Sequence, residues 1–203
     1  MEVIKVVPRG YCKGVINAIQ LAKKTAQLHP DTPIYVLGML VHNSYVMRAL
    51  KELHIYPVDD KAKTRLELLD EIDEGIVIFT AHGISPAVKE KAAQKGLQCV
   101  DASCPDVMKT QDIVTEQLKK GCDVLYIGKP HHPEAEAVVS LSTKVHLIST
   151  EKDVEQLPAM EHVFVTNQTT MSIFDIEALF EAIRKRYPNA VFCEEICNAT
   201  RIR

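Results

Sequence analysis

The sequence predicts an α/β protein of two similar modules, each with a mostly parallel, helix-flanked sheet. Two observations support this fold class. Short β-branched runs alternate with longer amphipathic stretches along the chain, which is typical of parallel sheets covered by helices. In addition, Cys12, Cys104 and Cys197 lie 92 and 93 residues apart, each beside a polar turn, so each interval holds about one α/β module.

The predicted strands and helices alternate in order along the chain. The strand-like runs are the segments 2–7, 33–38, 75–83, 98–104, 123–128, 144–149 and 162–170. The amphipathic, helix-like stretches are the segments 17–29, 44–53, 85–96, 105–121, 132–141 and 172–188. We therefore expect a first module at 1–103, which includes the Cys12 turn, and a second at 104–203, which ends at the Cys197 turn.

Local signals support these boundaries. Ser85 and Pro86 combine a capping hydroxyl with a proline at the first helical position, which is typical of a helix start. Gly96 and Gly121 are expected to close helices in the left-handed conformation.

Polar residues come just after several predicted strands. His42, His82, His132 and Thr169 follow the runs VLG, VIF, LYIG and VFVTN. In open parallel sheets the carboxyl ends of the strands line the ligand crevice. The sequence therefore predicts that the functional residues share one edge of the fold.

Composition and charge exclude several classes of protein. With 24 Lys and Arg against 27 Asp and Glu, the net charge is −3, which provides no positive field for a nucleic-acid partner. No run of 18 apolar residues and no secretory leader pattern is present, so we expect a cytoplasmic protein without a membrane anchor. In that reducing compartment, the six cysteines are expected to bind metal or act chemically rather than form disulfides.

Three of the cysteines are candidate ligands of a soft metal or an iron–sulfur cluster, since thiolates favour such centres. Cys104 and Pro105 also form the cysteine-proline step found near cluster ligands. Spacing alone leaves open the alternative of buried structural thiols. Cys99 and Cys122 are expected to pack in the core, and the role of Cys193 stays open.

The other candidate site residues each have a structural alternative. His42, His82 and His132 can donate to phosphate oxygens, or they can be ordinary surface or capping residues. Glu134 can act as a general acid, or it can complement a helix dipole. Thr169 can bind a substrate hydroxyl, or it can cap the next helix. The sequence has no Walker A or G-x-G-x-x-G pattern, so it does not support nucleotide binding.

Seven motifs together carry a resemblance. In this order, PRGYCKGV, LGMLVHN, TAHGISP, DASCPDV, HHPEAEA, VTNQTTMS and EEICNATRIR closely resemble the 4-hydroxy-3-methylbut-2-enyl diphosphate reductase family, iron–sulfur enzymes of the non-mevalonate isoprenoid pathway. The similarity covers the entire chain. It implies an architecture of three modules around a central cluster, of which the third is expected to be absent from this sequence.

The resemblance also implies a cofactor and a reaction. The cofactor would be a [4Fe-4S] cluster held by Cys12, Cys104 and Cys197, which leaves one iron open to the substrate. The reaction would be a two-electron reduction that removes the hydroxyl of the allylic diphosphate and yields isopentenyl and dimethylallyl diphosphate. An external electron donor such as flavodoxin or ferredoxin would be the partner.

The family pattern assigns roles to individual residues. His42, His82 and His132 would bind the diphosphate, Thr169 would bind the substrate hydroxyl, and Glu134 would be the catalytic proton donor. Two other functions stay open. One is a truncated, non-catalytic iron–sulfur module, and the other is an α/β domain that binds phosphorylated molecules with all cysteines free.

Overall fold

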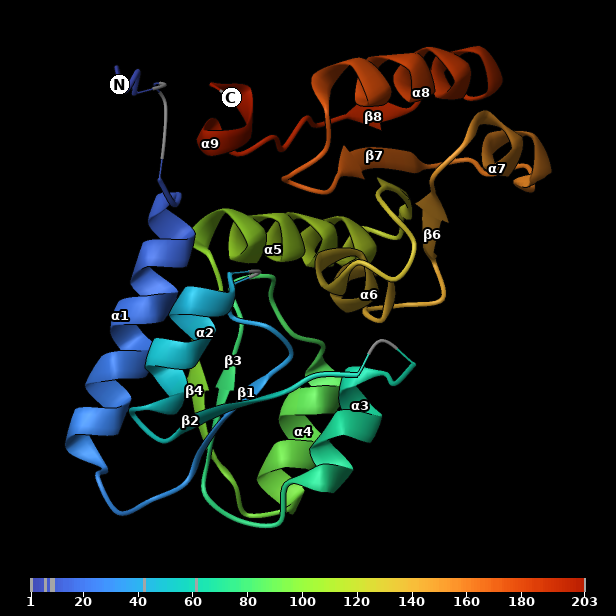
Figure 1. The fold of residues 1–203 in the computed structure, drawn as a ribbon. Coiled ribbons are helices and arrows are strands. Elements are labelled where there is room, and N and C mark those ends of the chain that lie inside the picture. The colour runs from blue at the N-terminus through green and yellow to red at the C-terminus, as the bar shows by residue number, and fades with distance from the viewer. Residues whose placement is uncertain (1, 6, 8–9, 42, 61, 203) are drawn as a thin grey trace.

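The computed structural model describes residues 2–5, 7, 10–41, 43–60 and 62–202. It contains two four-stranded sheets, and every strand pair in both sheets is parallel. Helices cover the sheets, as Figure 1 shows. The predicted α/β class with two helix-flanked parallel sheets is therefore confirmed.

The two sheets have the same strand order. In space, the first sheet runs β2 (Ile55–Val58), β1 (Ile34–Leu37), β3 (Ile76–Phe79) and β4 (Gln98–Asp101). The second sheet runs β6 (Val145–Ile148), β5 (Asp123–Ile127), β7 (Val163–Asn167) and β8 (Val191–Phe192). In the first sheet the chain goes from β1 outward to β2 and then crosses back to β3, on the other side of β1. The second sheet repeats this path with β5, β6 and β7. A switch point of this kind opens a ligand crevice at the carboxyl ends of the two central strands.

The helices repeat in the same way. The first module contains α1 (Lys13–Leu28), α2 (Ser44–Lys51), α3 (Arg65–Leu68), a 3₁₀ turn at Leu69–Glu71 and α4 (Pro86–Gln94). The second contains α5 (Pro105–Lys119), α6 (Pro133–Val139), α7 (Glu151–Gln156) and α8 (Ile173–Arg186), and α9 (Asn198–Arg201) follows β8. In Figure 1, α5 and α6 lie between the first sheet and β7 of the second.

Alternation along the strands creates a core on both faces of each sheet. In β1, Ile34 and Val36 pack with α1 and α2, whereas Leu37 packs with α3 and α4 on the opposite face. In β5, Leu125 packs with α7 and α8, whereas Tyr126 packs with α5 and α6. Because both faces are buried, the strands read as continuous apolar runs.

The predictions for the helix start at Ser85 and Pro86 and for the two glycines are confirmed. Ser85 caps α4 by accepting a hydrogen bond from Val88 N–H, and Pro86 is the first helical residue. Gly96 and Gly121 adopt positive φ values of 70° and 89°. Among the described residues, no helix is both long enough and apolar enough to cross a lipid bilayer.

Two expectations are wrong. The described residues of the segment 2–7 form no strand, and Val3 and Ile4 are exposed, since no described strand lies alongside to pair with them. Cys99 is exposed rather than packed in the core, because it lies on β4 at the edge of the first sheet.

Cys122 is half-buried and packs against the hydrophobic cluster that contains Tyr126.

Gly75 provides a test of the first sheet. Its φ is +106°, and a Cβ there would lie 2.4 Å from the Pro33 carbonyl oxygen. We predict that Gly75→Ala lowers the free energy of unfolding by about 2 kcal/mol or more in urea titrations, through strain and this clash. Gly96→Ala is the control, since its φ is +70° but no atom lies within 4 Å of the new Cβ. Equal losses for the two variants would contradict the role of the Pro33 contact.

Candidate functional site

The three candidate ligand cysteines occupy equivalent positions in the fold. Cys12, Cys104 and Cys197 are the N-cap residues of α1, α5 and α9, each with an extended backbone. A helix N-terminus carries partial positive charge, which favours a thiolate nearby. A cysteine therefore comes directly before the first helix of each module, and a third cysteine comes directly before α9.

Backbone hydrogen bonds hold two of these cysteines at the carboxyl edges of the sheets. Cys104 N–H donates to the Ala81 carbonyl oxygen at 2.9 Å, and Cys197 N–H donates to the Thr169 carbonyl oxygen at 2.9 Å. Ala81 follows β3 and Thr169 follows β7. The cysteines are thus attached to the loops where the switch points place a ligand crevice.

Close approach of the thiols depends on Gly14. A Cβ on Gly14 would lie 2.9 Å from Cys104 Sγ and 3.9 Å from Cys12 Sγ, so the absent side chain leaves room for both sulfurs. Cys12 also shares a cavity of about 750 Å³ with Cys197. Burial raises the pKa of the Cys104 thiol, whereas hydrogen bonds from the Asp106 and Val107 amides oppose this rise.

Among the described residues, no three His, Cys, Asp or Glu side chains are arranged to hold one metal ion. The donors present at this edge are thiols, the ligand type that soft metals and iron–sulfur clusters favour. Cys12 and Cys197 line one cavity, and the sulfurs of Cys12 and Cys104 both lie next to the space beside Gly14.

Glu134 is a fully buried acid beside this edge. Thr169 N–H donates to its Oε1 at 2.7 Å, Tyr126 O–H donates to the same oxygen at 3.3 Å, and Thr169 Oγ1 bonds to Oε2 at 3.1 Å. Burial raises the pKa of Glu134 to about 7, against the hydrogen bonds from Thr169 and Tyr126. A carboxyl with such a pKa can deliver protons near neutral pH.

The structure settles the alternative for Thr169 but keeps both interpretations of Glu134. Glu134 is in the first turn of α6, where an acid complements the helix dipole, and its carboxyl is buried. Thr169 does not cap the next helix, since the N-cap of α8 is Ser172. Thr169 instead connects Glu134 to the Cys197 backbone through its own side chain, N–H and carbonyl oxygen.

Two of the candidate histidines meet between the modules. His82 follows β3 and His132 caps α6, and their rings lie edge to face with centroids 5.2 Å apart. His132 Nδ1 accepts a hydrogen bond from Glu134 N–H at 3.2 Å. Both rings line a cavity of about 420 Å³. His42 lies outside the described residues.

The structure adds cations that the sequence analysis missed. Lys129 lines both the histidine cavity and the cysteine cavity. Its place in GKPHHPE, three residues before His132, was the available signal.

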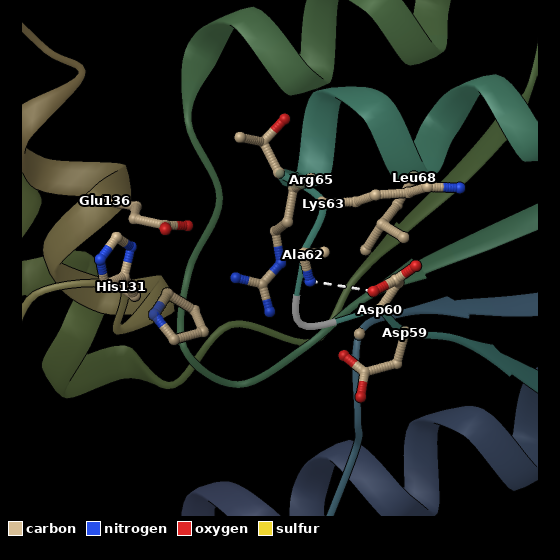
Figure 2. A pocket seen from close by; sticks show the side chains of 11 residues that line it. Asp59, Asp60, Ala62, Lys63, Arg65, Leu68, His131 and Glu136 are labelled. Atoms are coloured by element: carbon tan, nitrogen blue, oxygen red, sulfur yellow. Dashed lines mark hydrogen bonds between the residues drawn. The ribbon is translucent and has the colours of Figure 1, made fainter.

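Arg65 is the second missed cation. Its guanidinium donates to the Leu37 carbonyl oxygen at 3.4 Å and to Thr80 Oγ1 at 3.3 Å. Figure 2 shows it pointing into a cavity of about 570 Å³, between Glu136 on one side and Asp59 on the other. Burial lowers the pKa of Arg65, and these two carboxylates oppose that effect. No sequence motif marks this residue.

The fold and the site define an α/β protein with a cysteine-lined cavity and a buried carboxyl at the carboxyl edges of two parallel sheets. The chain belongs to the LytB protein family, since the family model described as LytB protein matches residues 3–203. This finding confirms the resemblance derived from the seven motifs.

Relatives and solved structures agree with this assignment. The chain is 49% identical to the 4-hydroxy-3-methylbut-2-enyl diphosphate reductase of Anoxybacillus flavithermus and 47% identical to that of Listeria monocytogenes. All of this chain is matched, but it spans 65% and 62% of those relatives. It also resembles the solved E-1-hydroxy-2-methyl-but-2-enyl-4-diphosphate reductase from Plasmodium falciparum, with a TM-score of 0.86 and 30% identity over 96% of this chain and 60% of that one.

The raised pKa of Glu134 makes a prediction about stability. A folded-state pKa of about 7, against the usual 4.5, means that the neutral acid favours folding below pH 4.5 and that this contribution is lost as the pH rises to 7. Between pH 5 and pH 8, Glu134→Gln should therefore gain about 2 to 3 kcal/mol of unfolding free energy relative to wild type, measured by urea titration. A constant difference between the two proteins over this range would contradict the raised pKa.

Proposed function

We propose that this chain takes part in the reductive dehydroxylation of 4-hydroxy-3-methylbut-2-enyl diphosphate to isopentenyl and dimethylallyl diphosphate. The observation that carries the proposal is the chain of contacts from Glu134 through Thr169 to the backbone of Cys197. It joins a buried acid to a candidate cluster ligand. The names of the relatives support the same reaction.

A [4Fe-4S] cluster held by Cys12, Cys104 and Cys197 is the cofactor we propose. An all-sulfur donor set at three helix N-caps, with room left by Gly14, supports it. When bound, such a cluster supplies electrons and an open iron that can act as a Lewis acid on the substrate hydroxyl.

The overall reaction needs two electrons and two protons, because the substrate loses its hydroxyl as water and its allylic carbon gains a hydrogen. Glu134 is the proton donor that we propose, since its pKa of about 7 keeps part of it protonated near neutral pH. Thr169 Oγ1 lies 3.1 Å from Glu134 Oε2 and would bind the departing hydroxyl. Burial of both groups keeps bulk water away from the proton.

The substrate diphosphate would lie near the histidine cavity. His82 and His132 supply ring N–H donors there, and Lys129 adds a positive charge on the side of the cysteine cavity. His42 completes the proposed set of diphosphate ligands.

The remaining proposals concern organisation and partners. We place the boundary between the modules at 103 and 104, between the end of β4 at Asp101 and the start of α5 at Pro105. Electrons would come from a small redox protein such as flavodoxin or ferredoxin. A cytoplasmic location would keep thiols reduced, in keeping with six cysteines that form no disulfide.

Iron analysis and turnover test the proposed function together. After anaerobic reconstitution, we expect about four irons per chain in wild type and Cys122→Ser, and a loss of most iron in Cys12→Ser, Cys104→Ser and Cys197→Ser. Glu134→Gln should keep its iron but lose at least about a hundredfold in turnover of the diphosphate with a chemical reductant.

The outcomes separate the competing functions. Iron without turnover in wild type would indicate a non-catalytic iron–sulfur module. A chain without iron that binds pyrophosphate would indicate a phosphate-binding domain with free cysteines.

Gly14 gives a sharper test of the cluster site. Gly14→Ala should raise helix stability by about 0.5 to 1 kcal/mol in isolation, yet its Cβ would displace Cys104 Sγ. We predict less than half of the wild-type iron content, with an unchanged circular dichroism spectrum. Asn17→Ala, an exposed position on the same helix, is the control and should retain its iron. Full iron content in Gly14→Ala would contradict a cluster in contact with Cys12 and Cys104.

A further inference from the structure

Tyr126 is a buried tyrosine whose hydroxyl has one polar partner among the residues that the structure describes. It lies in β5 with 0% exposure, among apolar side chains of α5, α6 and β7. A tyrosine hydroxyl in such surroundings requires a hydrogen-bond acceptor. That acceptor is Glu134 Oε1, at 3.3 Å.

The position of the ring is closely defined. Gly128 lies directly above it, and a Cβ on Gly128 would come within 3.1 Å of Tyr126 Cε1 and 3.3 Å of Ala135 Cβ. The chain therefore passes over the ring at the point where β5 ends and the loop toward Glu134 begins. This packing keeps the hydroxyl directed at the carboxyl.

The hydrogen bonds make the two carboxyl oxygens of Glu134 unequal. Oε1 accepts from Thr169 N–H at 2.7 Å and from Tyr126 O–H, so both of its lone pairs are used. Among the described residues, the one hydrogen-bond partner of Oε2 is Thr169 Oγ1, a hydroxyl that can turn from donor to acceptor. When Glu134 is protonated, the proton must therefore reside on Oε2.

We propose that Tyr126 is a positioning residue that fixes the acid proton of Glu134 on Oε2, next to the Thr169 hydroxyl. This inference rests on the proposed role of Glu134 as proton donor. In the transfer, the Oε2–H bond breaks, Thr169 Oγ1 receives that proton and gives its own to the departing hydroxyl, and Glu134 is left as a carboxylate. Protons from solvent restore the acid between turnovers, and no electrons move in this step.

The groups facing Glu134 come from four elements. Tyr126 lies on β5, Thr169 follows β7, His132 caps α6, and Asp106 on α5 acts as a like charge that raises the pKa of Glu134. Burial raises the pKa of Tyr126 well above 10, so its hydroxyl stays a donor. Its hydrogen bond favours the carboxylate form, and its removal should raise the pKa of Glu134 further.

Tyr126→Phe tests the proposal on the intact chain. The carboxyl of Glu134 is followed by infrared difference spectroscopy during a pH titration, and Glu134→Gln identifies its band. We expect the titration midpoint to rise by about one pH unit, and the C=O stretch of the acid to move to higher frequency because Oε1 loses a donor. An unchanged midpoint and frequency would overturn the proposal.

Tyr187→Phe is the matched control. Tyr187 is also buried, and its hydroxyl donates to the Pro158 carbonyl oxygen at 2.6 Å, in a different core cluster from that of Tyr126. This variant should leave the Glu134 titration where it is. An equal shift in both variants would mean general loosening of the core and would also overturn the proposal.

A second measurement avoids any folding defect of the variant. In wild type carrying ¹³Cζ-labelled tyrosine, one tyrosine resonance should titrate with the midpoint of Glu134 and should stop titrating in Glu134→Gln. No such resonance would contradict the hydrogen bond. Neither experiment needs a cluster or a substrate. The role of Tyr126 can therefore be contradicted while the proposed reduction stands, and the proposed reduction can be contradicted while the role of Tyr126 stands.

Discussion

Two backbone hydrogen bonds organise the site: Cys104 N–H to the Ala81 carbonyl oxygen, and Cys197 N–H to the Thr169 carbonyl oxygen. Each one attaches the start of a new helix to the loop after the third strand of the preceding sheet. Because parallel sheets direct all these loops to one edge, the cysteines reach the same edge as the buried carboxyl of Glu134. The two bonds thus join residues that are 23 and 28 positions apart in sequence, Ala81 to Cys104 and Thr169 to Cys197.

Both modules have the same topology, which explains why the candidate site residues of both modules lie in loops that follow strands. Both sheets have the same strand order, so both have a switch point between their two central strands. The loops after β3 and β5 provide His82 and His132, and the loop after β7 provides Thr169. The modules differ in what they add: the first provides Arg65 beside the histidine cavity, and the second provides the buried acid and its donors.

Periodicity and spacing predicted the fold class, because buried parallel strands are continuous apolar runs and the cysteines repeat with the modules. The sequence did not predict three short elements. The strand β2 contains Pro57 and lies at a sheet edge, and the helices α3 and α7 have only four and six residues. Thr64 and Glu67 form a capping box at the start of α3, which a pattern search could find. The segment 2–7 was predicted wrongly because strand propensity does not supply a neighbouring strand. Tyr126 could not be identified as a site residue, since its partner is known only after the loop toward Glu134 has folded.

The central proposal is that three cysteine thiolates surround one cluster and leave one iron for the substrate. Mössbauer spectroscopy of the chain reconstituted with ⁵⁷Fe tests this claim most directly. We predict two kinds of iron, the minority kind changing when 4-hydroxy-3-methylbut-2-enyl diphosphate is added and the majority kind staying as it was. Four equivalent irons that ignore the diphosphate would contradict the account, and would indicate a fourth protein ligand such as Cys193.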